Sequence, residues 1–141
     1  MNSDNNKTTP FFKFENLRLY HKAIDFSKAI LALATINASM ASAHFFNRFF
    51  DETLNLVTTI ANGSAESKNG FINHLQLTKV SIRNCVVLCT LASKRNLIDV
   101  EQENDIRNEL MELTKMVGAL LISLQRQDSL QEENMEDVNL K

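Results

Sequence analysis

The sequence contains very little glycine, proline or tryptophan. Among 141 residues there are three glycines, one proline and no tryptophan, whereas apolar residues make up 44%. Turn-dense β structure needs more glycine and proline than this, so the composition favours long helices with short connections. A chain of this length can bury one hydrophobic core without disulfides or metals. We therefore predict a single all-α domain.

Signals for membrane insertion, secretion and disulfide bonding are also missing. No apolar run approaches the roughly 18 residues that cross a bilayer, and the N-terminus lacks a basic patch followed by an apolar segment and a cleavage site. Cys85 and Cys89 lie one helical turn apart, whereas a disulfide framework places its cysteines on different elements. We expect a cytoplasmic protein with reduced cysteines buried on a helical seam.

Motifs that carry catalytic or metal chemistry are absent as well. The chain has no Gly-rich phosphate loop, nucleophile elbow or HExxH pair. His74 and Cys85 would be about 16 Å apart along one helix, too far to share an ion, and no Glu-x-x-His pair is present to complement the cysteines. The sequence therefore predicts no enzymatic activity, no metal site and no other cofactor.

Four segments show the apolar spacing of amphipathic helices. They run from about Asn16 to Thr35, from Ala43 to about Asn62, from Lys68 to Arg95 and from Val100 to about Arg126. Short connections between helices of this length predict an antiparallel up-down-up-down four-helix bundle over residues 12–127. Residues 1–11 are polar enough to form a flexible lead, and residues 128–141, with five acidic residues and one lysine, are predicted to form a disordered acidic tail.

Local sequence signals predict where these helices begin and end. Asn16, then Ser64 or Ser67, and the pair Asp99 and Gln102 are the predicted N-terminal caps. Gly63 and Asn96 stand where a helix C-terminus takes a left-handed residue. Gly118, within the fourth helix, costs about 1 kcal/mol relative to alanine, and this cost would be recovered if a neighbouring backbone came close.

The third predicted helix carries a row of positive charge. Between Ser67 and Ile98 there are five basic residues and no acidic one. Four of them, Lys68, Lys79, Arg83 and Lys94, fall within an arc of about 80° and span about 39 Å of helix. Such a row can contact several phosphates of a nucleic-acid backbone. The alternatives are a solvated face and an electrostatic seam with the matching acidic arc of the fourth helix, which consists of Glu101, Asp105, Glu109 and Glu112.

Several segments resemble a known family. Residues 14–23 (FENLRLYHKA) are similar to the F-x-x-L-x-hydrophobic-aromatic-x-K-A opening of the intervening-sequence four-helix-bundle proteins, whose first members were encoded in insertions within bacterial large-subunit ribosomal RNA genes. Residues 59–64 (TIANGS) resemble that family's N-I-A-E-G-S turn, and parts of residues 71–81 follow its next helix. Thr59, Asn62, Glu66 and Val80 depart from the pattern. The likeness spans about residues 12–125.

The resemblance implies a ring-shaped homo-oligomer, commonly a pentamer, with no established enzymatic activity. A similar fold is used by the accessory variability determinant of diversity-generating retroelements, a basic pentamer that works with a reverse transcriptase and RNA. In such an assembly the wide apolar stripe of the first helix and the phenylalanines of the second, represented by Phe26, Phe45 and Phe49, are expected at the oligomer interface.

Two functional hypotheses follow. In the first, a non-enzymatic oligomer binds RNA, or a nucleic-acid enzyme such as a reverse transcriptase, through the basic row of the third helix. In the second, the protein is a structural scaffold, and its basic and acidic rows form a seam between subunits. Neither hypothesis includes a membrane or a small-molecule substrate.

Overall fold

The computed structural model describes residues 11–139, and its side chains through Gln127. Over this range the chain forms a short 3-10 helix, η2 (Lys13–Asn16), and four α-helices, α1 (Arg18–Ile36), α2 (Ala43–Ser64), α3 (Lys68–Lys94) and α4 (Val100–Asn139), with no β-strand. The all-α prediction is confirmed. The predicted flexible lead lies outside the described residues except at Phe11.

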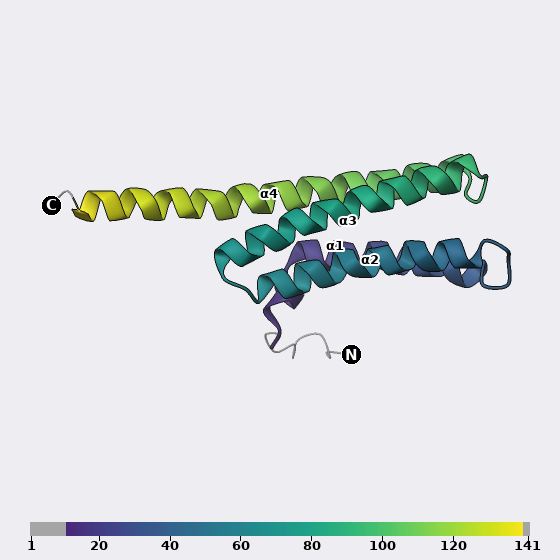
Figure 1. Ribbon diagram of the computed structural model, residues 1–141, viewed down its shortest axis with the longest axis horizontal. Helices are drawn as coiled ribbons and strands as arrows, with labels where there is room; N and C mark the ends of the chain where they lie inside the picture. The colour runs from purple at the N-terminus through teal and green to yellow at the C-terminus, as the bar shows by residue number, and fades with distance from the viewer. Residues whose placement is uncertain (1–10, 140–141) are drawn as a thin grey trace, which may run out of the picture.

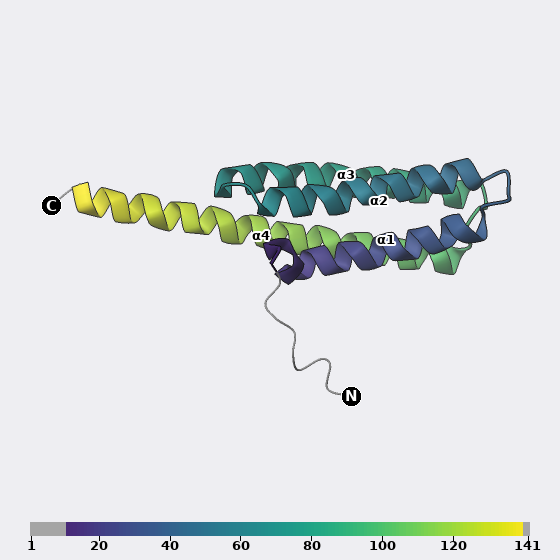
Figure 2. The ribbon, with the colours of Figure 1, turned by 90° about the horizontal axis from the view of Figure 1, so that it is seen from below.

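The four helices lie side by side in two layers. The α1–α2 and α3–α4 turns are at the same end of the molecule, and the α2–α3 turn is at the other end (Figure 1). In the turned view, α2 and α3 form one layer and α1 and α4 the other (Figure 2). Each helix contacts the next one along the chain, and α4 contacts α1 more sparsely. This arrangement is consistent with a four-helix bundle, and α4 projects well beyond its end (Figure 1).

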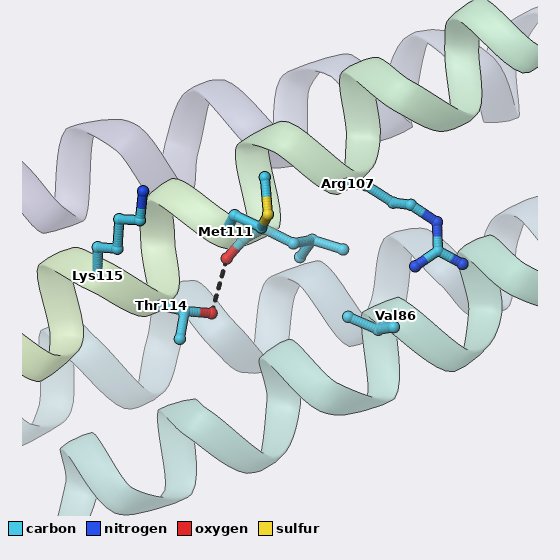
Figure 3. Close-up of a pocket in the computed structure, with 6 residues that line it drawn as sticks. Val86, Arg107, Met111, Thr114 and Lys115 are labelled. Atoms are coloured by element: carbon cyan, nitrogen blue, oxygen red, sulfur yellow. Dashed lines mark hydrogen bonds between the residues drawn. The ribbon is translucent and has the colours of Figure 1, made fainter.

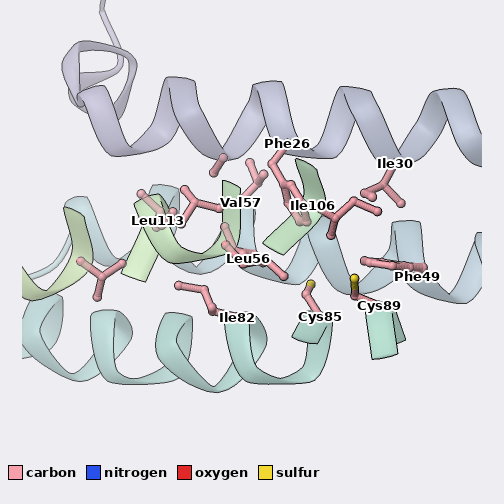
Figure 4. Close-up of a cluster of buried hydrophobic side chains, with 14 of the residues drawn as sticks. Phe26, Ile30, Phe49, Leu56, Val57, Ile82, Cys85, Cys89, Ile106 and Leu113 are labelled. Atoms are coloured by element: carbon pink, nitrogen blue, oxygen red, sulfur yellow. The ribbon is translucent and has the colours of Figure 1, made fainter. Parts of the chain in front are cut away.

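The core lies between the two layers and draws on all four helices. Phe26 and Ile30 of α1, Phe49 and Leu56 of α2, Cys85 and Cys89 of α3, and Ile106 and Leu113 of α4 are all buried there (Figure 4). Phe26 and Phe49 are only 1% and 0% exposed. Both belong to the interior of a single chain, so the prediction that they form an oligomer interface is wrong. Phe45 is partly buried and packs edge-on against Phe46 and Phe49.

The two apolar rows of α1 differ in burial. The row that contains Leu19, Ala23, Phe26 and Ile30 faces the core, whereas Ile24 and Leu31 of the other row are exposed. The other helices of the chain therefore cover one side of the wide apolar stripe, and burial of its other side in an oligomer stays a prediction.

Three helix ends form as predicted, and at two of them a side chain close in sequence satisfies a free backbone group. Ser67 caps α3 by accepting a hydrogen bond from the Gly70 amide at 3.2 Å. At the start of α4, Asp99 Oδ1 accepts from the Gln102 amide at 2.7 Å, and Gln102 Oε1 accepts from the Asp99 amide at 2.9 Å. Asn96, beyond the end of α3, has the left-handed φ of 58°.

Two predicted helix ends are wrong. Asn16 does not cap α1; it ends η2, and Leu17 precedes α1 without a capping side chain. Gly63 does not end α2 in a left-handed conformation, because α2 continues to Ser64 and no glycine has a positive φ within the described residues. A Cβ atom at Gly63 would lie 2.5 Å from Cβ of His74. The glycine is therefore required by the close approach of α3 and not by a turn.

The course of α4 also differs from expectation. The helix continues to Asn139, whereas a disordered tail was predicted from residue 128; residues 140–141 lie outside the described part. Glutamine, glutamate, leucine and methionine are good helix formers, and extending an existing helix needs no new nucleation. A Cβ atom added at Gly118 would have no neighbour within 4 Å among the described residues, so no other described segment comes close to the backbone here.

Candidate nucleic-acid interface

The basic row of α3 lies on one side of an uninterrupted helix. Lys68 is in its first turn and Lys94 is its last residue. Arg83 and Lys94 are exposed, whereas Lys68 and Lys79 are partly buried. Lys79, Arg83 and Lys94 form no hydrogen bond or ion pair with any residue that the structure describes. Three of the four predicted cations are therefore not neutralised by a neighbouring side chain.

The acidic row of α4 does not meet this basic row within the chain. Glu112 pairs instead with Lys22 of α1, at 3.1 Å. Asp105, Glu109 and Glu112 line a hollow between α4 and α1, on the side of α4 away from α3. No electrostatic seam between these two rows forms within the described part of the chain, because Asp105, Glu109 and Glu112 lie on the side of α4 that faces α1.

A mostly apolar groove lies between α3 and α4 beside the basic row. Its walls are Val86 from α3 and Leu110, Met111 and Thr114 from α4 (Figure 3). Lys79 and Arg83 precede Val86 by seven and three residues, so they project on about the same side of α3 as Val86. The groove therefore runs alongside two of the three unpaired cations.

Helix α4 adds two basic residues to this groove, Arg107 and Lys115 (Figure 3). The Arg107 guanidinium donates to Thr90 Oγ1 at 2.8 Å and lies 3.6 Å from Glu103 Oε1, so its charge is partly used within the chain. Lys115 is exposed and makes no ion pair with the described residues. The sequence analysis missed both residues, because it considered only the acidic residues of the fourth helix; the spacing of Arg107 and Lys115 by about two helical turns was the available signal.

The outward face of α3 is unexpectedly apolar. Leu77, Val80, Val87 and Leu91 are between 42% and 58% exposed, and their spacing places them on one side of the helix. We call these four residues the α3 apolar strip. Exposed apolar side chains that gather on one face are typical of contact surfaces. The strip lies next to the basic row, so α3 presents both charge and apolar area to a partner.

A polar cluster joins α2 to α3 on the other side of the strip. Glu52 is only 3% exposed, and its carboxylate accepts hydrogen bonds from Asn84 at 3.0 Å, Arg48 at 3.4 Å and Asn55 at 3.5 Å. A buried charge is tolerated where it is paired and hydrogen-bonded. The sequence analysis missed this cluster. The available signal was the position of Glu52, which is three residues after Phe49 and four before Leu56 and therefore falls within the apolar stripe of α2.

The two cysteines are free and buried, as predicted. Burial, followed by the charge of Glu52, raises the pKa of the Cys85 thiol from 9.0 to about 12. Burial also raises the pKa of Cys89. Both groups therefore remain thiols near neutral pH, and a thiol is a poor nucleophile and metal ligand. Among the described residues no three histidine, cysteine or acidic side chains gather as metal ligands would.

Comparisons with known proteins add no identification. No family model, curated protein or solved structure matches the chain. The structure itself, over the part described, contains no helix with the length and apolar character to span a membrane.

Proposed function

We propose that this chain is a non-enzymatic, cytoplasmic bacterial protein of the intervening-sequence four-helix-bundle type that binds RNA through the basic row of α3. In this proposal the helices form an antiparallel up-down-up-down bundle, and copies assemble into a ring, most simply a pentamer. The observation that carries the RNA-binding part is that Lys79, Arg83 and Lys94 are accessible on one side of α3 and unpaired among the described residues.

The physical basis of this proposal is phosphate neutralisation. Lys79 and Lys94 are separated by about 22 Å along the helix, a distance that several phosphates of an extended strand can span. Each contact between a cation and a phosphate releases condensed counterions, which favours binding at low salt. Cations already engaged with carboxylates would contribute little, so the lack of carboxylate partners supports this role.

The proposal is tested by reversing two charges in the row. In Lys79→Glu/Arg83→Glu, RNA that accompanies the protein through purification at low salt should be lost. A matched control, Arg18→Glu/Lys28→Glu, makes the same net charge change at two exposed residues of α1 and should retain RNA. Native mass spectrometry reports bound RNA and subunit number together, and circular dichroism checks helicity. Equal RNA retention by both double variants would refute the proposal.

A second candidate function is a scaffold in which the basic row forms a seam between subunits. The observation that favours it is the α3 apolar strip, which adjoins the basic row, together with acidic residues on α4 that have no described partner, such as Glu101 and Asp105. In this case Lys79→Glu/Arg83→Glu should dissociate the oligomer, and added salt should weaken it without any nucleic acid present. A nucleic-acid enzyme such as a reverse transcriptase is the further partner that the family resemblance implies.

A further inference from the structure

The end of α4 extends beyond the rest of the bundle. Leu124 is the last described side chain of α4 that packs against the core, yet the helix continues to Asn139, about 22 Å farther along its axis. In both views no other described helix lies beside this end (Figures 1 and 2). We call residues 128–139 the projecting end of α4. Helices in proteins owe most of their stability to packing, so a partner outside the chain would stabilise this end.

The charge of the projecting end suits a basic partner. Residues 128–139 contain five acidic residues and no basic one. Asp128, Glu132 and Glu136 recur at intervals of four, and like charges at that spacing destabilise a helix. Acidic residues are also unfavourable near a helix C-terminus, and Glu136 and Asp137 precede the last residue of α4 by three and two positions. Cations supplied by a partner would offset both effects.

The outward face of α3 has the matching charge and spacing. Lys79 and Arg83 are unpaired among the described residues, and they are four residues apart, as Glu132 and Glu136 are. Two helices that lie side by side can therefore align a cation with a carboxylate at both positions. The α3 apolar strip lies next to these cations and offers apolar contact as well. The projecting end has three apolar residues to contribute, Leu130, Met135 and Val138.

The chain cannot make this contact with itself. Helix α4 is uninterrupted and leads away from the bundle, so its projecting end does not reach Lys79, Arg83 or Lys94 of the same chain (Figures 1 and 2). We propose that the projecting end of α4 lies along the basic row of α3 in a second copy of the chain. The two surfaces differ, so the contact is head-to-tail, and repeated contacts of this kind close into a ring or continue as a filament.

This contact would regulate access to the basic row. The cations that would pair with the projecting end are those proposed to neutralise RNA phosphates, so carboxylates of a neighbouring copy and phosphates of RNA compete for them. RNA would then displace the projecting end. The competition rests on the proposed RNA-binding function, whereas the contact between copies does not.

Cross-linking with a water-soluble carbodiimide tests the contact directly, because this reagent joins an amine to a carboxylate that touches it. Full-length protein labelled with nitrogen-15 and unlabelled protein are treated with nuclease, mixed in urea, refolded together and cross-linked at low salt. Mass spectrometry should find peptides that join Lys79 or Lys94 to Glu132 or Glu136, with one labelled and one unlabelled partner. Cross-links from these lysines only to the acidic row of α4 would overturn the proposal, as would no cross-link from them.

Neutral variants measure how much the contact contributes to assembly. Glu132→Gln/Glu136→Gln removes two exposed ion pairs of the proposed contact and should weaken self-association by about 2- to 30-fold in analytical ultracentrifugation. The matched control, Asp25→Asn/Asp51→Asn, removes the same charge from exposed residues of α1 and α2 and should assemble as wild type. Equal self-association of the two variants would overturn the proposal.

Charge reversal on both sides tests whether the two surfaces meet. Lys79→Glu/Arg83→Glu should weaken self-association, and adding Glu132→Lys/Glu136→Lys to the same chain should restore it, because each pair then has opposite charges again. A quadruple variant that assembles no better than the double variant, although circular dichroism shows that it is folded, would contradict the pairing of these residues.

Added RNA separates this contact from the proposed RNA binding. A twelve-nucleotide uridine oligomer should reduce the cross-links, and Glu132→Gln/Glu136→Gln should bind it about 2- to 30-fold more tightly than Asp25→Asn/Asp51→Asn does. Cross-links in a protein that binds no RNA support the contact and refute the RNA proposal. RNA binding without cross-links overturns the contact and leaves the RNA proposal standing. Cross-links that persist when RNA is bound would overturn the competition.

Discussion

Two glycines in helices should respond in opposite ways to the same substitution. A Cβ atom at Gly63 would lie 2.5 Å from Cβ of His74, whereas one at Gly118 would have no neighbour within 4 Å. Inside a helix, alanine is favoured over glycine by about 1 kcal/mol. Gly118→Ala should therefore raise the free energy of unfolding by about that amount.

At Gly63 the steric cost exceeds the helical gain. Overpacking a tight interior usually costs about 1–3 kcal/mol. The cost here belongs at the upper end, because Cβ of His74 is fixed to its backbone and α2 and α3 must separate to make room. Subtracting the helical gain of about 1 kcal/mol leaves Gly63→Ala destabilised by about 2 kcal/mol.

Urea and thermal unfolding monitored by far-ultraviolet circular dichroism measure both variants, since the chain has no tryptophan for fluorescence. At about 3 °C per kcal/mol, Tm should fall by about 6 °C for Gly63→Ala and rise by about 3 °C for Gly118→Ala. All proteins are compared at one concentration, because assembly alters apparent stability. A Gly63→Ala protein as stable as wild type would refute the close packing of α2 on α3, and a destabilised Gly118→Ala protein would indicate that another chain approaches α4.

Two further predictions concern the core. Phe49→Ala should cost about 3–5 kcal/mol of stability, whereas Ile24→Ala should cost less than about 1 kcal/mol, because Phe49 fills the interior and Ile24 is exposed. Equal losses in urea unfolding would contradict the placement of Phe49 in the core and of Ile24 on the surface. The pKa of Cys85 is raised from 9.0 to about 12 in the folded chain, so the unfolded chain loses this thiol proton first and stability should fall as pH rises through that interval. Urea unfolding at several pH values measures this decrease in the free energy of unfolding with pH, and Cys85→Ala should make the decrease smaller. An unchanged decrease in the variant would show that other groups cause it.

Sequence reasoning succeeded where a structural feature depends on neighbouring residues in the chain. The caps at Ser67 and at Asp99 with Gln102 form because a side chain reaches a backbone group three residues away, and such contacts do not depend on the rest of the fold. The basic row of α3 was likewise predictable, because helical geometry alone places its members on one side.

Features that depend on which helices are neighbours were not predictable from single-helix patterns. The assignment of Phe26 and Phe49 to an oligomer interface failed because each apolar stripe can face a core or a partner, and only tertiary packing distinguishes these. Gly63 had the signature of a helix end, but its role comes from His74 on the next helix. The Glu52–Asn84 contact joins residues on different helices, so its parts were visible in the sequence but their proximity was not.

The salt dependence of single-stranded RNA affinity tests the central claim most directly. For single-stranded RNA, each neutralised phosphate contributes about −0.7 to the slope of the logarithm of the association constant against the logarithm of salt concentration. If Lys79, Arg83 and Lys94 each neutralise a phosphate, the slope should therefore be about −2 or steeper. In Lys79→Glu/Arg83→Glu both the affinity and the steepness should decrease, whereas Arg18→Glu/Lys28→Glu should retain the wild-type slope. An affinity that is independent of salt, or slopes that are equal in both double variants, would contradict an RNA-binding role for the basic row of α3.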